Sequence, residues 1–129
     1  MQNPYTSSET HRLHVDSCAV EDGVAVVRLR GEADLHTAPL LRDALDEAIE
    51  TGADTLVIDL TSVTFVDSMM LGVLLGATRR TRHRGTEMRI VVDDPHVRRI
   101  FELTLLDRVL QLYPSLQLAL DRDDGSSGG

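Results

Sequence analysis

Residues 57–72 of this 129-residue chain read VIDLTSVTFVDSMMLG, and this stretch decides the fold class. It begins within a nearly continuous apolar run, TLVIDL at residues 55–60, which is typical of a strand covered on both faces of a sheet. After Ser68 the apolar residues recur at helical spacing, and several arginines follow before Gly85. The stretch therefore predicts a central strand followed by a helix, with Asp67 and Ser68 at the junction.

The flanking sequence predicts further strands and helices that fit the same sheet. Residues 13–29 carry alternating and β-branched apolar residues around a turn signal, which predicts a β-hairpin. Residues 37–52 have apolar residues at helical spacing, with Thr37 as a candidate N-cap. The remaining expected elements are a strand over 88–92, a helix after Asp94 and Pro95, a short strand near 108–112 and a last helix capped by residues 113–115. This order predicts an α/β fold with one mixed β-sheet and helices packed mainly on one face.

A single domain is expected over residues 11–120. Residues 1–10 are polar, and residues 121–129 form an acidic tail rich in Gly and Ser, so we expect both ends to be disordered. Hydrophobic residues make up 42% of the chain and Trp is absent, so the core must be built mainly from aliphatic side chains. The residues expected in the core are Val57, Ile58, Leu60, Leu71, Leu74 and Leu75.

The composition narrows the class of partner. A formal net charge of −8 disfavours nucleic acid and anionic lipid, which carry the same sign. The longest apolar stretch, residues 69–77, is far shorter than the roughly 20 residues that span a bilayer. Cys18 is the only cysteine, and residues 1–10 do not resemble a signal peptide. We therefore expect a cytoplasmic protein that binds another protein, without direct nucleic-acid contact or membrane insertion.

Asp67 and Ser68 allow two interpretations. Backbone N–H groups at a helix N-terminus lack intrahelical partners and favour negative charge. One of these two residues can therefore be an ordinary N-cap, or Ser68 can carry a phosphate. The stretch by itself leaves both interpretations open.

The sequence carries no catalytic pattern. The five histidines lack the spacing of a metal site, no GxSxG motif surrounds Ser68, and no Gly-rich GK[ST] loop occurs. The carboxylates of Asp34, Asp59 and Asp67 have no evident catalytic partner. We expect a protein that is not an enzyme and needs no cofactor and no metal. The arginines over residues 79–84 either complement a helix C-terminus or form a basic docking patch.

Five short motifs, in a fixed order, resemble those of the STAS-domain anti-sigma factor antagonists of bacteria. The resemblance extends from about Val15 to Leu120 and rests on order and spacing, because each motif alone is weak. The motifs are Gly31-Glu32-Ala33-Asp34, Ala38-Pro39, Asp59-Leu60, Phe65-Val66-Asp67-Ser68 and Leu71-Gly72-Val73-Leu74-Leu75.

This resemblance implies a STAS-like domain and a regulatory function. In the family, an anti-sigma factor that is itself a serine kinase phosphorylates the serine at the position of Ser68, and only the unphosphorylated antagonist binds it and releases the sigma factor. A phosphatase acting on Ser68 would restore binding. The partner-binding residues implied here are Asp34, Thr37, Asp67, Ser68, Met69 and Met70. The alternatives are a non-switching STAS-like regulatory or scaffold subunit of a signalling or transport assembly and, more weakly, a small-molecule-binding module.

Two positions depart from the family pattern, which has glycine where this chain has Met70 and Leu105. The Met70 side chain either leans over Ser68 and hinders the kinase or packs into the core, and the same choice applies to Met69. The sequence leaves open whether the two large residues abolish phosphorylation.

Overall fold

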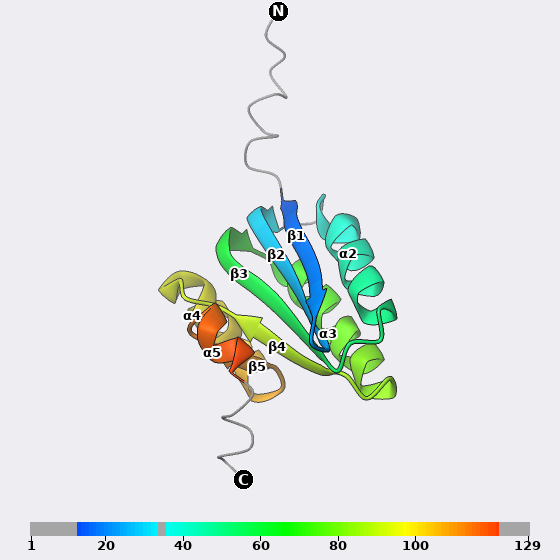
Figure 1. The fold of residues 1–129 in the computed structure, drawn as a ribbon. Coiled ribbons are helices and arrows are strands. Elements are labelled where there is room, and N and C mark those ends of the chain that lie inside the picture. The colour runs from blue at the N-terminus through cyan, green and yellow to red at the C-terminus, as the bar shows by residue number, and fades with distance from the viewer. Residues whose placement is uncertain (1–12, 34–35, 122–129) are drawn as a thin grey trace, which may run out of the picture.

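The computed structural model describes residues 13–33 and 36–121, and these form one five-stranded mixed sheet with helices on both faces (Figure 1). The expected disordered ends lie outside the described residues, except for Asp121. The strand order is β1-β2-β3-β4-β5, with β1 antiparallel to β2 and all later pairs parallel. The strands are β1 (His14–Glu21), β2 (Val24–Ala33), β3 (Thr55–Val66), β4 (Glu87–Val91) and β5 (Gln111–Tyr113).

The helices begin close to the expected positions. They are α2 (Ala38–Glu50), α3 (Ser68–His83), α4 (Pro95–Leu103) and α5 (Leu116–Leu120), with a 3-10 turn η1 (Leu106–Arg108) before β5. The Asp94 carboxylate accepts a hydrogen bond from the N–H of His96 (2.7 Å) and caps α4. The Ser115 hydroxyl caps α5 in the same way, through the N–H of Leu118 (3.2 Å). Short polar side chains therefore fix where these helices start.

Two apolar layers cover the sheet. The larger core lies between one face of the sheet and helices α2, α3 and α4, and contains Leu56, Ile58 and Leu74. On the other face, α5 packs through Ala119 against a small cluster that includes Val57. The expectation of helices mainly on one face is confirmed, with α5 as the exception (Figure 1).

The central strand β3 is longer than the sequence predicted. Its first half, Thr55–Leu60, is buried throughout, as the apolar run indicated, and residues 55–59 pair with both neighbouring strands. Its second half continues to Val66 along β2 alone, because β4 pairs only as far as Asp59. Irregular register in the β2–β3 pair accompanies this extension. β3 thus carries the chain past the end of β4 before α3 begins.

The expected core residues are buried, with one exception. Val57, Ile58, Leu60, Leu71 and Leu74 are buried, whereas Leu75 is only half-buried. The assignment of Leu75 to the fully buried core was therefore wrong. Leu75 belongs to the apolar run but follows Leu74 by one position, so it points about 100° away around the helix.

This difference gives a test of the packing. Replacing Leu74 with Ala should lower the free energy of unfolding by about 2–5 kcal/mol, because the methyl groups leave a cavity in the main core. The matched change Leu75→Ala should cost less, since part of that side chain already contacts water. Urea denaturation of both variants checks the order, and equal losses would contradict the described face of α3.

Leu105 adopts an unusual backbone conformation. Its φ and ψ of 62° and 15° lie in the left-handed region at the start of η1, and its side chain is exposed. This backbone conformation costs a residue with a Cβ about 1–2 kcal/mol, whereas glycine adopts it without that cost. This cost explains physically why a glycine suits the position.

We expect Leu105→Gly to raise the free energy of unfolding by up to about 1 kcal/mol. The relief of strain outweighs the extra unfolded-chain entropy of glycine, which costs about 0.4–1 kcal/mol. The control is Leu103→Gly, which changes the last residue of α4 and should destabilise. Thermal melts of the two variants check the signs, and a destabilised Leu105→Gly protein would show that no strain is stored there.

Candidate functional site

The register of two central strands brings the candidate segments together. At their carboxyl ends, Ala33 of β2 pairs with Val66 of β3. Adjacent strands lie about 4.8 Å apart, so the chain leaves β2 beside the point where it leaves β3. Asp34, predicted to lie in the site, follows Ala33 but is outside the described residues.

Asp67 is the N-cap of α3. Its Oδ1 accepts hydrogen bonds from the N–H groups of Met69 (3.0 Å) and Met70 (3.1 Å), while its backbone is extended. The capping interpretation of this residue is therefore correct. Because the cap uses this carboxylate, Asp67 defines the start of α3 and adds a negative charge beside Ser68.

Ser68 is the first residue of α3, and its side chain is exposed. Two apolar side chains close to it in the sequence also face solvent: Phe65 at 46% exposure and Met69 at 45%. Phe65 stands opposite Glu32 of β2 in the strand register. The site therefore presents a hydroxyl beside apolar and acidic groups, which is a surface suited to contact with another protein.

The exposed face of α3 continues from Ser68 to Gly72, which lies one helical turn further on. A Cβ added to Gly72 would meet no atom within 4 Å, so the glycine is not required by packing. The absence of a side chain leaves the helix backbone open to close approach by another molecule.

Two predicted partner-binding residues are not at the surface. Met70 is fully buried in the main core, so of its two interpretations the packing one is correct, and its assignment to the partner-binding surface was wrong. It lies two positions after Ser68, on the side of α3 that faces the sheet. Thr37 is also buried, and its hydroxyl donates to the carbonyl of Glu32 (3.2 Å). It is the N-cap of α2 by position but makes no side-chain cap bond.

Phe65 and Gly72 occur in the quoted motifs, but the sequence reasoning did not assign them to the partner-binding surface. Phe65 belongs to an apolar pair with Val66, and strict strand alternation would expose only one of the two. Gly72 lies on the exposed face of α3, opposite its apolar stripe. Because a glycine weakens a helix and adds no packing there, its presence points to a function at the surface.

The buried carboxylate of Asp59 has a structural role. It lies 4.0 Å from the Arg28 guanidinium and accepts a hydrogen bond from the N–H of Thr61 (3.0 Å). Within residues 13–33 and 36–121, no group of three or more His, Cys, Asp or Glu side chains is arranged to hold a metal ion. No helix in this part of the chain is long and apolar enough to cross a membrane.

Comparison with known proteins identifies the family of this chain. Residues 17–119 match the family model of the STAS domain. The chain belongs to the STAS domain family. Among its curated relatives, an anti-sigma F factor antagonist of Paenibacillus polymyxa is 36% identical over 70% of this chain and 79% of the relative. The anti-sigma-F factor antagonist RsfB of Mycobacterium tuberculosis is 35% identical over 79% and 83%.

Solved STAS structures share the fold. An anti-sigma factor antagonist from Mycobacterium paratuberculosis has a TM-score of 0.79 at 34% identity, covering 85% of this chain and 92% of that one. The antagonist SpoIIAA in its unphosphorylated form gives 0.69 at 26%, over 88% and 96%. The phosphorylated form of SpoIIAA from Bacillus gives 0.63 at 25%, over 85% and 97%. The STAS chain thus resembles a regulator that has been solved in two phosphorylation states.

The open position at Gly72 leads to a stability prediction. Gly72→Ala should raise the free energy of unfolding by about 0.5–1 kcal/mol, because alanine favours the helix and meets no neighbour. The control is Gly52→Ala, at a φ of +77°, which should destabilise since a Cβ is strained there. Urea denaturation measures both, and a destabilised Gly72→Ala protein would show that this face of α3 is packed.

Proposed function

We propose that this STAS protein is an anti-sigma factor antagonist that binds an anti-sigma factor serine kinase, and that phosphorylation of Ser68 ends the binding. The observation that carries the proposal is the position of Ser68, exposed at the first residue of α3 and next to a capping carboxylate. The relatives named as anti-sigma factor antagonists support the class of partner. The proposal places the protein in the bacterial cytoplasm, where sigma factors act.

The exposed surface around Ser68 supports a docking site. Phe65 and Met69 supply apolar area to bury, and Gly72 allows the partner to approach the backbone of α3. A serine on such a surface is within reach of a kinase that docks there. Met70 lies beneath this surface and leaves access to Ser68 unobstructed.

Phosphorylation would change the charge of this surface while leaving the fold intact. A phosphate on Ser68 adds about −1.5 to −2 charge. The N-terminus of α3 favours a negative group there, so the helix tolerates the modification. The added charge lies next to Asp67, and together they repel an acidic partner surface and raise the cost of desolvation on docking. Ser68 thereby acts as a switch of binding.

The reaction needs no catalytic group from this chain. The kinase transfers the γ-phosphoryl group of its bound ATP to the Ser68 oxygen, the hydroxyl proton leaves, and ADP is released. A phosphatase acting on Ser68 would hydrolyse the ester and return the binding form. This protein is then a substrate and a ligand, not an enzyme.

A non-switching subunit is the second candidate, because Phe65 and Met69 form an apolar contact surface that works without any modification. Incubation of the full chain with an anti-sigma kinase and ATP, followed by mass spectrometry, distinguishes the two. A gain of one phosphate that Ser68→Ala abolishes supports the switch. Tight binding without phosphate transfer supports the non-switching subunit.

Charge at position 68 should control affinity. Ser68→Asp should weaken binding to the kinase by about tenfold or more, because like charges at an interface are costly, whereas Ser68→Ala should bind as the unaltered protein does. Isothermal titration calorimetry with a purified anti-sigma kinase provides the measurement. Equal affinities of the two variants would contradict the switch.

Close approach at Gly72 should matter independently of charge. Gly72→Gln should weaken binding by about tenfold or more, since its side chain projects into the proposed interface, while the fold is retained. The matched control is Gly72→Ala, whose small side chain should reduce affinity far less. If Gly72→Gln bound the kinase at full strength, this face of α3 would lie outside the interface.

A further inference from the structure

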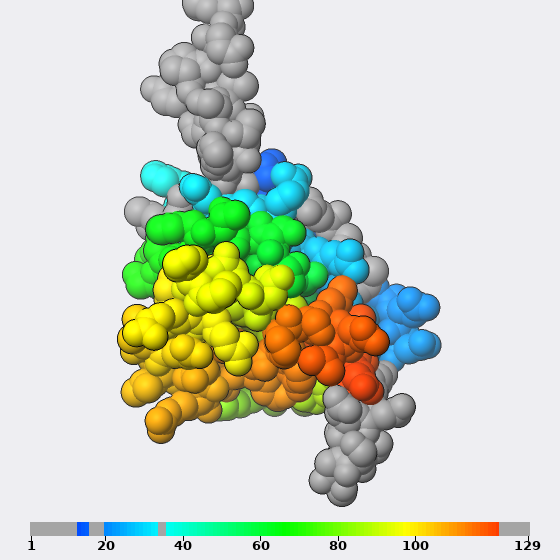
Figure 2. Space-filling model, turned by 90° about the vertical axis from the view of Figure 1, so that its left-hand side faces the viewer, coloured from blue at the N-terminus to red at the C-terminus, as the bar shows by residue number. Residues whose placement is uncertain are grey.

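The segment between α4 and β5 exposes an apolar surface that the proposed kinase site does not use. Leu103 is 69% exposed, Leu105 56% and Val109 48%. Leu103 is the last residue of α4, and Leu105 and Val109 flank the 3-10 turn η1. The N–H groups of Val109 and Leu110 both donate to the carbonyl of Leu106. In Figure 2 this gold-coloured segment forms a lower corner of the molecule, below the green surface of the β3–α3 region.

The strained backbone of Leu105 favours a role for its side chain in contact with another molecule. The residue occupies the left-handed region, where glycine is favoured by about 1–2 kcal/mol, and its side chain gains little from burial. Backbone strain of this kind persists where other requirements outweigh it, most often at binding sites. An exposed leucine held in this way is suited to contact with another molecule.

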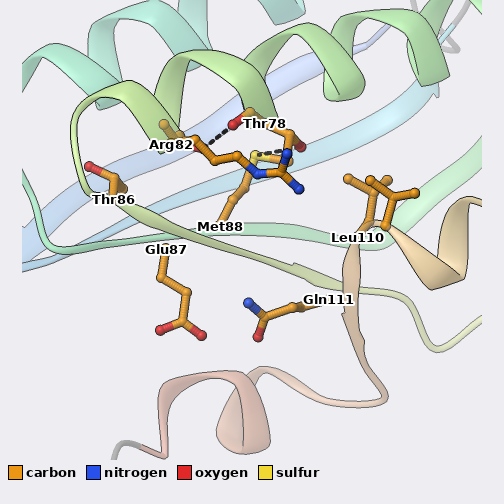
Figure 3. A pocket seen from close by; sticks show the side chains of 9 residues that line it. Thr78, Arg82, Thr86, Glu87, Met88, Leu110 and Gln111 are labelled. Atoms are coloured by element: carbon orange, nitrogen blue, oxygen red, sulfur yellow. Dashed lines mark hydrogen bonds between the residues drawn. The ribbon is translucent and has the colours of Figure 1, made fainter.

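A small cavity opens beside the same turn. It has a volume of about 120 Å³ and lies between the last turns of α3 and the first residues of β4 and β5 (Figure 3). Its lining includes Val109, Leu110 and Met88, with threonine hydroxyls from α3 and the loop before β4. Sites for small ligands usually enclose about 300–1,000 Å³, whereas a cavity of about 150 Å³ takes up a single benzene ring. The volume of the cavity therefore fits one side chain better than a whole cofactor, and Met88, Val109 and Leu110 supply its apolar part.

Basic side chains border this apolar area. Arg82 lines the cavity together with Val109, and Arg79 lies on the same side of α3, one turn earlier. Both are exposed, as is Arg84, and none of the three forms an ion pair with another residue in the described part of the chain. In a chain of net charge −8, this end of α3 is a local concentration of positive charge.

Two of the acidic groups nearby form ion pairs with arginines. Glu87 lines the cavity, but its carboxylate pairs with Arg89, at 3.0 Å from Nε. Glu102 of α4 lies 3.5 Å from Arg98. Asp107 is exposed within the turn, and Arg108 follows it directly. Arg79, Arg82 and the C-cap residue Arg84 therefore outnumber those of these acidic side chains that form no ion pair within the described part of the chain.

We propose that this surface, formed by Leu103, Leu105, Val109, the adjoining cavity and the arginines of α3, is a second docking site. Its occupant is an acidic segment of a partner protein that carries one large apolar side chain. The apolar side chain enters the cavity beside Leu110, and the flanking carboxylates pair with Arg79, Arg82 and Arg84. Apolar anchoring next to charge complementarity is the arrangement of a specific protein interface.

A protein segment suits this surface better than a nucleic acid or a membrane. Both of those extend well beyond the patch and would face the negative charge carried by the rest of the chain. A peptide contacts only the patch. The single-side-chain size of the cavity also requires a defined anchor, which a bilayer surface does not offer.

The second site is spatially separate from Ser68. Arg82 follows Ser68 by fourteen positions on α3, which corresponds to about 21 Å along the helix axis. One partner can therefore occupy each end of α3 at the same time. The proposal does not depend on the kinase-binding function of the Ser68 surface.

The test uses the full chain and a pool of short fluorescent peptides in which one leucine or phenylalanine is flanked by aspartate and glutamate. Fluorescence anisotropy should show saturable binding of pool members. Replacing the apolar residue with serine, or the acidic residues with lysine, should abolish it. Absence of binding by every acidic peptide, or equal binding of the lysine version, overturns the proposal.

Variants of the chain locate the binding. Arg82→Glu and Val109→Ser should each weaken the peptide by about tenfold, and Leu105→Gly should weaken it while raising the melting temperature. Two controls should bind normally: Arg42→Glu, an equal charge change on the exposed face of α2, and Ser68→Asp. Binding that is insensitive to Arg82→Glu and Val109→Ser, or that Ser68→Asp weakens equally, overturns the assignment.

A vesicle assay tests whether a lipid surface, instead of a protein segment, occupies this second site. Co-sedimentation of the full chain with vesicles of phosphatidylglycerol and phosphatidylcholine should show no binding. Sedimentation that Arg82→Glu abolishes, together with failure of the acidic peptides, would identify a lipid surface as the occupant and refute the protein segment.

Discussion

Strand β3 must be buried on both faces, and this constraint organises the rest of the molecule. Leu56 and Ile58 face the main core, while Val57 faces the smaller cluster under α5. Such a strand is stable only if both faces are covered and both edges are paired, which β2, β4 and the helices provide. Because the pairing with β2 continues to Val66 after β4 has ended, the end of β3 projects beyond β4. The candidate site is built on that projection.

The first turn of α3 shows how one short segment serves packing and also carries the proposed binding surface. Asp67 fixes the start of the helix by accepting two backbone hydrogen bonds. The 100° rotation per residue then directs Met70 into the core and leaves Ser68 and Met69 in solvent. The buried methionine holds the helix against the sheet, so Ser68 is presented on a rigid element. A modification there changes the charge of the surface while the packing beneath it stays the same.

The two ends of α3 carry different chemistry. At the N-terminus the helix dipole, the cap and the serine favour a site controlled by negative charge. At the C-terminus the arginines complement the opposite end of the dipole, and three of them have no carboxylate partner among the described residues. These arginines can therefore both stabilise the C-terminus of α3 and form a basic docking patch, because a cation that stabilises a helix end remains available to a ligand. The left-handed conformation of Leu105 lowers the stability of the free protein.

Local sequence was sufficient to predict the elements and several of their boundaries. Alternation, helical spacing and the caps at Asp67, Asp94 and Ser115 act within a few residues of each other, and the structure agrees with them. The STAS resemblance likewise rested on short motifs in order. These signals also placed the pair Asp67 and Ser68 at the junction of β3 and α3.

Tertiary structure decided which side chains of the site reach solvent. The sequence placed Thr37, Met69 and Met70 together at the interface, but only Met69 is exposed. The sequence also did not indicate that β3 extends beyond β4 or that Phe65 faces solvent. Nor did it indicate that α5 alone covers the face of the sheet opposite the main core. These properties depend on strand register and on the direction of each helix against the sheet. Both are set by contacts between residues distant in sequence, which local patterns do not encode.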